Sequence, residues 1–257
     1  MKPPRISVQI WPQHADYAQI RRAWAEADAL ADAIFLWDHF FPLSSDPRGK
    51  HFEAWTLLSA MAEVTARAEI GALVTCNSYR NPQLLADMAR TVDHISRGRL
   101  ILGIGAGWFE KDYKEFGYDF GTRGTRIRAL AANVPLIKAR LAKGNPPPTR
   151  RIPFLIPGTG PKVALRIVAE HADIWHAFGD PEEWRRRNEL LNRWCAKVGR
   201  DPAAIERSVS VGTEKPLEQA EGFRKVGATH VVLGVDGPAY DLGPLRELIA
   251  WRDRLAR

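Results

Sequence analysis

The sequence predicts an α/β fold in which strands and helices alternate along the whole chain. Short apolar, β-branched runs are separated by longer amphipathic stretches, and the tally is eight strand–helix units in 257 residues. That number and that length are typical of a (β/α)8 TIM barrel. A doubly wound sheet also alternates strands and helices, but it normally needs fewer strands. Because no change in composition divides the chain, we expect residues 1–257 to form a single domain.

The first four units are identified from apolar periodicity and from helix-start signals. Asn81 and Pro82 form a clear start, since asparagine caps helices and proline at the first position loses no hydrogen bond. Apolar residues then recur at helical spacing at Leu84, Met88, Val92 and Ile95. The predicted strands are residues 6–10, 33–37, 69–75 and 99–104, and the predicted helices are residues 16–31, 53–65, 82–95 and 127–142.

The second four units follow the same pattern. Asp180, with Glu183 three residues later, has the spacing of a capping box and predicts a helix start. Residues 143–151 contain three consecutive prolines and are interpreted as a tight connection between two half-barrels, not as an interdomain linker. The predicted strands are residues 153–156, 173–176, 208–212 and 229–235, and the predicted helices are residues 161–171, a stretch after Asp180, 217–226 and 245–255.

The charge balance is basic, with 37 lysines and arginines against 30 acidic residues and a formal net charge of +7. Such a balance first points to nucleic-acid binding. However, the densest basic run, residues 185–187, follows two glutamates, and the other arginines are scattered over predicted solvent faces. We therefore interpret the charge as solvated surface and expect no nucleic-acid partner.

Membrane and disulfide classes find no support in the sequence. No stretch reaches the roughly 20 apolar residues of a membrane helix, and residues 1–5 are not followed by the apolar segment of a signal peptide. Cys76 and Cys195 stand alone, without a CxxC pair or histidines at ligand spacing. We expect a cytoplasmic protein with no metal site and no membrane partner.

In a barrel of this kind, functional residues lie where strands end and the following loops begin. These positions hold glycines, aromatic residues and one carboxylate–histidine pair, Asp38 and His39. Histidine titrates near neutrality and can transfer a proton, although a single histidine at a strand end is also commonly structural. A hydrolase or metalloprotease has no support, because neither a Ser–His–Asp arrangement nor an HExxH motif is found.

Two glycine-rich turns follow predicted strands. In residues 158–162, free N–H groups and the positive end of a helix dipole would bind a phosphate, with Thr159 and Lys162 nearby. The alternative is that Gly160 is only an N-cap in a short loop. Residues 103–108 do not match the dinucleotide fingerprint, because Trp108 stands at the third glycine position. A rim beneath a planar cofactor, or close packing of the strand end, explains these glycines.

An ordered series of segments resembles the bacterial luciferase-like superfamily, in particular its branch of oxidoreductases that use the deazaflavin coenzyme F420. The segments fall in family order over most of the chain, up to about the seventh strand. They are residues 35–42, 53–58, 79–82, 91–100, 103–110 and 158–175.

The resemblance implies a barrel whose mouth holds the deazaflavin ring, with Asp38 and His39 beside it as the catalytic residues. It places the cofactor phosphate at the turn of residues 158–162, in agreement with the anion site. It also implies a non-prolyl cis peptide beneath the ring near Leu73 and Val74. The cofactor-binding residues that it implies are Asp38, Leu73, Val74, Thr75, Asn77, Gly105, Ala106, Gly107, Gly158, Thr159, Gly160 and Lys162.

Three departures from the family pattern qualify the resemblance. Sugar-phosphate dehydrogenases of the superfamily carry a catalytic glutamate and a tryptophan where Trp108 and Leu43 stand here, so that activity is not expected. Relatives have a long segment that covers the active site where this chain has only residues 143–151. We therefore expect a more open mouth, or one completed by another subunit. His176 stands where relatives more often have asparagine.

The first hypothesis is a deazaflavin-dependent oxidoreductase that transfers a hydride between coenzyme F420 and a small organic substrate. The alternatives are an FMN-dependent luciferase-like monooxygenase and a noncatalytic deazaflavin- or flavin-binding protein. Apolar residues in excess of one buried helix face predict a homodimer. The expected interface is the second and third helices, with Trp55, Leu58, Leu84, Met88 and Val92, and Trp184 and Trp194 form a second apolar set.

Overall fold

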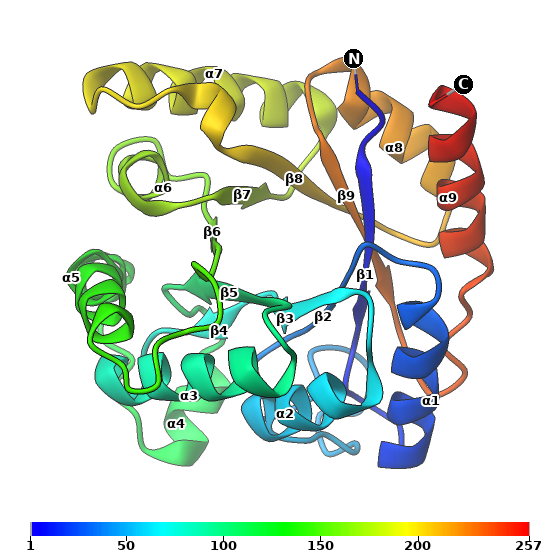
Figure 1. Cartoon of the computed structure of the whole chain (residues 1–257), viewed down its shortest axis with the longest axis horizontal. Helices are drawn as coiled ribbons and strands as arrows, with labels where there is room; N and C mark the ends of the chain where they lie inside the picture. Colours follow the sequence, from blue (N-terminus) through cyan, green and yellow to red (C-terminus); the bar gives the residue numbers. More distant parts are fainter. Residues whose placement is uncertain (1, 257) are drawn as a thin grey trace.

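The strands form one closed parallel barrel in the computed structural model, which describes residues 2–256 (Figure 1). Apart from β3 and β4, each strand pairs with the next along the chain, and β9 pairs back onto β1, with Arg5 opposite His230. Because β4 continues the line of β3 and both pair with β5, the two segments occupy one strand position, and the nine segments form an eight-stranded barrel. The predicted TIM barrel is confirmed. The strands are β1 Arg5–Ile10, β2 Ala33–Leu36, β3 Glu69–Ala72, β4 Thr75–Cys76, β5 Leu100–Gly105, β6 Phe154–Pro157, β7 Ile174–Ala177, β8 Glu206–Val211 and β9 His230–Val235.

Helices surround the barrel, and two of them begin at the predicted caps. The Asn81 side chain accepts from Gln83 N at 2.9 Å, and the Asp180 side chain accepts from Glu183 N at 2.8 Å. Between residues 2 and 256, none of the helices combines the length and the apolar character needed to span a bilayer. The helices are α1 Tyr17–Asp28, α2 Ala54–Val64, α3 Pro82–Ile95, α4 Glu110–Phe116, α5 Arg123–Ala142, α6 Ala164–His171, α7 Pro181–Lys197, α8 Pro216–Lys225 and α9 Gly243–Leu255, and a 3-10 turn η1 covers Pro202–Ala204.

The structure corrects several of the predicted elements. The strand predicted over residues 69–75 is broken into β3 and β4 around a cis peptide bond between Leu73 and Val74, the bond that the family resemblance indicated. The short helix α4 was not predicted, and α5 begins at Arg123 instead of residue 127. The helix predicted from Pro161 begins only at Ala164, because residues 161–163 form a turn.

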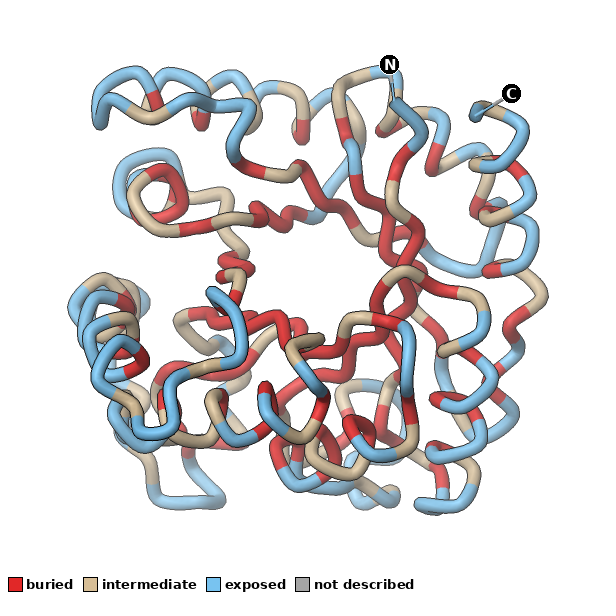
Figure 2. Tube along the Cα trace, in the orientation of Figure 1, coloured by how far each residue is buried: buried red, intermediate tan, exposed pale blue. Residues whose placement is uncertain are grey.

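Two apolar layers are buried on either side of the strands, which form the buried inner ring in Figure 2. The outer layer packs strands against helices. The inner layer fills the barrel with residues that share its interior: Ala33, Phe35, Leu73, Ile101, Leu155, Ile174 and Val232. Among the strands, most buried polar side chains come from β1 and β7–β9, including Gln9, His176, Ser208 and His230, and β4 adds Thr75. The barrel interior is therefore mostly apolar near β2–β6 and more polar near β1 and β7–β9.

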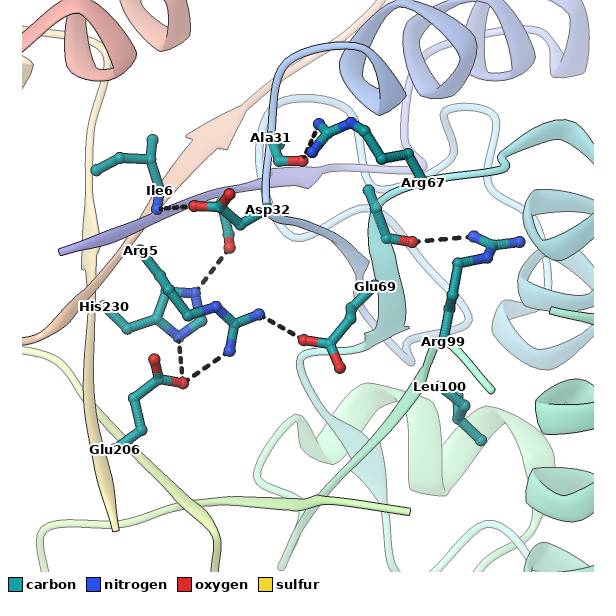
Figure 3. A network of polar contacts seen from close by, with 12 residues as sticks. Arg5, Ile6, Ala31, Asp32, Arg67, Glu69, Arg99, Leu100, Glu206 and His230 are labelled. Atoms are coloured by element: carbon teal, nitrogen blue, oxygen red, sulfur yellow. Dashed lines mark hydrogen bonds and ion pairs between the residues drawn. The ribbon is translucent and has the colours of Figure 1, made fainter. Parts of the chain in front are cut away.

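A polar network crosses the amino end of the barrel (Figure 3). The Arg5 guanidinium donates to Glu69 on β3 at 2.7 Å and to Glu206 on β8 at 2.9 Å. His230 Nδ1 lies 3.4 Å from the same Glu206 carboxylate. These contacts link strands on opposite sides of the barrel and occupy its amino end with paired side chains. A ligand site is therefore expected at the carboxyl end.

The connection of residues 143–151 lies at the same amino end, because it leads from the end of α5 into the start of β6. It packs against the last turn of α3, where Thr149 N and Oγ1 donate to Asp93 Oδ2 at 2.7 and 2.8 Å. The expectation that its shortness opens the mouth of the barrel is therefore wrong. The mouth is bordered instead by loops that follow strands, among them the segment containing α4.

Most of the apolar helix residues that were expected to form the dimer interface are buried within the chain. Trp55, Leu58, Val92 and Trp184 are all buried within the chain itself, so they are not surplus apolar surface. Met88 and Trp194 are partly buried against the core. Leu84 is 55% exposed and is the large apolar residue of the predicted interface that faces outward.

Candidate active site

A cavity of about 330 Å³ lies at the carboxyl ends of the strands. Its walls are mainly apolar and aromatic, and five polar side chains also line it: Gln9, Asp38, His39, Thr75 and His176. The apolar and aromatic lining residues include Trp11, Trp37, Leu43, Leu73, Val74, Tyr79, Trp108, Pro157 and Phe178. A concave apolar site with a few polar groups is the usual form of a small-molecule site.

The floor of the cavity is formed by the break between β3 and β4. Gln9 Nε2 donates to the carbonyl oxygen of Leu73 at 2.6 Å, next to the cis peptide bond. Leu73, Val74 and Thr75 all line the cavity. Thr75 Oγ1 is buried, and it has no hydrogen-bond partner among residues 2–256. The floor thus offers one unsatisfied hydroxyl to a ligand.

Glycines in β5 allow the backbone and side chains of residues 72–74 to approach this strand closely. A Cβ on Gly103 would lie 1.9 Å from the carbonyl oxygen of Ala72, and one on Gly105 would lie 2.8 Å from Val74 Cγ2. Close packing of the strand end therefore accounts for both glycines. Of the predicted cofactor-binding residues in this turn, Gly107 lines the cavity, and Gly105 and Ala106 lie behind its wall.

His39 is held at the cavity by a carboxylate that the sequence analysis missed. His39 Nδ1 lies 2.7 Å from Asp112 Oδ2, and Asp112 is fully buried on α4. Because the carboxylate accepts, Nδ1 carries the proton and Nε2 is the ring nitrogen left for a ligand. The rings of Trp108 and Phe109 pack edge-on against the imidazole. His39 is therefore fixed in both orientation and tautomer.

Asp112 also holds the surrounding loop. It accepts from the Tyr79 hydroxyl at 2.9 Å and from Phe40 N at 3.1 Å. Burial raises the pKa of Tyr79, with Cys76 and Asp112 adding to the shift, so Tyr79 remains a protonated donor. A signal for α4 was present in Gly117, which ends the helix with φ 71°. The sequence offered no sign that the Asp112 side chain turns inward.

Asp38 lines the cavity, and its carboxylate is engaged by Arg80 and by the backbone of Cys76. Arg80 donates to both oxygens, at 2.6 and 3.0 Å, and Cys76 N donates to Oδ2 at 2.9 Å. Arg80 also pairs with Glu53, the N-cap of α2. This arrangement ties the ends of β2 and β4 together.

One wall of the cavity contains the stacked indoles of Trp11 and Trp37, whose centroids are 5.2 Å apart. The ring of His51 lies beside Trp37 in nearly the same plane, within 2°, with the two centroids 6.5 Å apart. Trp37 Nε1 donates to His51 Nε2 at 2.9 Å. Burial lowers the pKa of His51 to about 4, so this ring is neutral and can accept. The stack makes a flat, stiff face at the mouth.

The two positions that depart from the sugar-phosphate dehydrogenase pattern both lie in the cavity wall. Trp108 is 63% exposed and stands at the rim, and Leu43 is fixed by its backbone N, which donates to Gln13 Oε1 at 2.9 Å. Both residues thus offer apolar surface in this part of the site.

The predicted anion turn lies just beyond β6. The carbonyl oxygens of Thr159 and Pro161 accept from Arg187 at 2.8 Å and from Trp194 at 2.7 Å, so two side chains of α7 hold the turn. Arg123, at the start of α5, has a guanidinium nitrogen 3.8 Å from the position of a Cβ on Gly160. Arg123 was not predicted, because only the tertiary fold brings α5 to this turn.

Asn77 is buried away from the main cavity. Its Oδ1 accepts from Asn133 on α5 at 3.1 Å, and its backbone N donates to the carbonyl oxygen of Gly105 at 2.9 Å. It joins the loop after β4 to α5 and to the end of β5.

His176 is fully buried beneath the cavity, between two serines of β8. Its Nδ1 lies 2.9 Å from Ser208 Oγ, and its Nε2 lies 3.1 Å from Ser210 Oγ. Burial, followed by the charge of His230, lowers the pKa of His176 to about 3. The imidazole is therefore neutral at ordinary pH and orders both hydroxyls.

This shift predicts a loss of stability in acid. The pKa of an unfolded histidine is near 6.5, so below that pH the unfolded chain binds a proton that the folded chain does not bind at His176. The free energy of unfolding therefore falls as pH falls. Between pH 7 and pH 5 we expect His176 to cost about 2 kcal/mol of unfolding free energy. Denaturant titrations of the wild type and of His176→Gln at both pH values check this. An equally steep pH dependence in His176→Gln would contradict it.

Comparison with known proteins agrees with this architecture. The model of the luciferase-like monooxygenase family matches residues 3–213. The phthiodiolone/phenolphthiodiolone dimycocerosates ketoreductase of Mycobacterium tuberculosis is 27% identical over 215 residues, which cover 74% of this chain and 55% of the ketoreductase.

Two solved structures share the fold at low sequence identity. One is an F420-dependent secondary alcohol dehydrogenase in complex with an F420–acetone adduct, with a TM-score of 0.82, 16% identity and 98% of each chain covered. The other is a type II Baeyer–Villiger monooxygenase from the CAM plasmid of Pseudomonas putida in complex with FMN, with a TM-score of 0.64, 14% identity and coverage of 80% and 67%.

Proposed function

Because the chain belongs to the luciferase-like monooxygenase family, we propose that it is an oxidoreductase that transfers a hydride between coenzyme F420 and a small organic substrate. The observation that carries the proposal is His39 at the cavity wall, with Nδ1 held by buried Asp112 and Nε2 left for a ligand. The F420-dependent alcohol dehydrogenase with the same fold and the ketoreductase relative support a carbonyl or alcohol as the reacting group.

The residues of the cavity fit a deazaflavin. The flat aromatic wall and the floor of Leu73 and Val74 match a planar ring, and the unpaired Thr75 hydroxyl would meet the polar edge of that ring. Beyond β6, the turn of residues 158–162 and Arg123 would hold the phosphate. When bound, the deazaflavin supplies a carbon that gives or takes a hydride.

The role of the protein is to orient the substrate and to manage one proton. Reduction of a carbonyl by hydride needs a proton at the oxygen, and oxidation of an alcohol must remove one. His39 Nε2 would exchange that proton, while the buried carboxylate of Asp112 would balance the charge of the imidazolium. The apolar walls would exclude water from the reacting atoms.

A flavin mononucleotide monooxygenase is the second candidate, and the FMN-bound neighbour supports it. A noncatalytic binder is the third. Titration of the purified protein with coenzyme F420 and with FMN, followed by their absorbance, separates the first two by affinity. Turnover of a panel of ketones with reduced F420 then separates an enzyme from a binder. Tight binding of FMN with no binding of F420 would overturn the main proposal.

The anion turn predicts different effects of two substitutions. A Cβ on Gly160 would meet protein atoms no nearer than 3.4 Å, so the turn itself can accept a side chain. We expect Gly160→Val to weaken F420 binding about tenfold or more, because the branched side chain would fill the phosphate site. Lys162→Ala should weaken it only about twofold to threefold, since an exposed charge is screened. Calorimetric titration measures both, and equal, negligible effects would place the phosphate elsewhere.

We also propose one domain and a homodimer, with α2 and α3 as the interface. Exposed Leu84 on α3 supports this location. Light scattering at micromolar concentration should give twice the chain mass, and Leu84→Glu should shift it toward the monomer. A monomeric wild type would refute the dimer, whereas a dimer unaffected by Leu84→Glu would refute its location. A cytoplasmic location stays a prediction.

A further inference from the structure

A second cavity lies beside the first at the mouth of the barrel. Its volume is about 530 Å³, and it covers the carboxyl ends of β8 and β9. Gln9, Trp11 and Phe178 line both cavities. A molecule whose reacting end lies in the first cavity can therefore extend into the second past these three side chains.

The shared wall has a closely packed part and a solvent-exposed part. The Trp11 indole lies against Gly234, where a Cβ would be only 2.8 Å from the ring, and the Tyr240 hydroxyl donates to the Trp11 carbonyl oxygen at 2.8 Å. Phe178, in contrast, is 61% exposed. The passage between the cavities is therefore bounded by a fixed indole on one side and by a solvent-facing phenyl ring on the other.

The polar lining of the second cavity differs from the anion turn across the mouth. It includes the carboxylate residues Glu214 and Asp236, and, counting residues 2–256, neither lysine nor arginine lines it. Hydroxyl residues Ser210 and Thr213 also contribute, and Ser210 Oγ lies 3.1 Å from His176 Nε2. An anionic ligand group would be repelled here, whereas N–H and O–H donors would find acceptors.

We propose that this second cavity holds the tail of the substrate, and that it takes a neutral or cationic group with N–H or O–H donors, such as a primary amine or a hydroxyl. The proposal rests on the proposed function, because that function places the reacting end of the substrate in the first cavity. Arg123 and Lys162 would direct the anionic part of the cofactor to the turn beyond β6, away from β8 and β9. The charge difference across the mouth thus assigns its two sides to two ligands.

The test compares ligands that differ only in their end group. Two methyl ketones of equal length, one ending in a primary amine and one in a carboxylate, are assayed with reduced coenzyme F420. Hexylamine and hexanoate are titrated calorimetrically against the protein without cofactor. We expect kcat/KM to favour the amine-ended ketone about threefold to tenfold. Glu214→Gln should reduce this preference, and Glu214→Lys should reverse it.

The matched control is Glu218→Gln on α8, which removes the same charge from a residue paired with Lys215 at 3.5 Å outside the cavity. It should leave the preference unchanged. Equal kcat/KM for both ketones, or the same change in Glu218→Gln as in Glu214→Gln, would overturn the proposal. If neither ketone reacts but hexylamine binds more tightly than hexanoate in a way that Glu214→Lys reverses, the site stands and the proposed function falls.

Discussion

Replacing His39 with alanine is expected to lower turnover about 10²–10⁴-fold, the range in which a positioned acid or base contributes to catalysis. The imidazole lies at the cavity wall with Nε2 left for a ligand, so its loss removes the group that would exchange the substrate proton. Affinity for F420 should change only a few-fold, because the floor and the anion turn remain. Steady-state kinetics and cofactor titration measure the two effects separately.

His39→Asn separates chemistry from structure. The asparagine amide can still donate toward Asp112, so this variant should keep the thermal stability of the wild type and yet lose turnover like His39→Ala. Unchanged turnover in both variants would make His39 a structural residue. It would also remove the observation on which the proposed function rests.

Asp112→Asn is expected to lower kcat about 10²-fold while KM and cofactor affinity stay within a few-fold. The amide keeps a hydrogen-bonding group near Tyr79 and Phe40 N but removes the negative charge that faces His39 Nδ1. The amide can turn its NH2 group toward Nδ1 and so select the other tautomer, and an uncharged partner does not stabilise the imidazolium. Steady-state kinetics on an identified substrate give the split between kcat and KM.

Tyr79→Phe is the control for this effect. It removes another hydrogen bond to the same carboxylate but leaves the contact with His39, so turnover should fall no more than about threefold. If Tyr79→Phe costs as much as Asp112→Asn, the loss reflects disturbance of the loop, and Asp112 does not act through His39.

The order of strands and helices could be predicted from the sequence, because the apolar periodicity of each element depends only on residues within that element. Helix caps at Asn81 and Asp180 are also local, and both are confirmed. The break at Leu73 and Val74 came from family resemblance, since no pattern in residues 69–75 marks it. Local signals also placed the ends of the strands, and with them His39 and Thr75 at one mouth.

The partners of these residues could not be predicted, because they are set by tertiary contacts. Asp112 reaches His39 across 73 positions, and Arg80 reaches Asp38 across 42. Arg123 reaches the anion turn only because α5 packs beside it. Trp55 and Trp184 were expected at the surface, but both are buried. Periodicity shows which face of a helix is apolar, but it does not show how much of the helix circumference the rest of the barrel covers. Side-chain pairing and burial width are thus what the structure adds.

The pairing of β1 with β9 has a consequence for how the chain folds. Arg5 and His230 are neighbours in the barrel although nearly the whole chain separates them, and Arg5 also binds Glu206. Contacts of such long sequence separation slow folding, because the entropy of closing a long loop must be met before they form. During synthesis on the ribosome, β1 cannot pair with β9 until nearly the whole chain has been made. Until then its open edge is exposed to other chains, so aggregation during synthesis competes with closure of the ring.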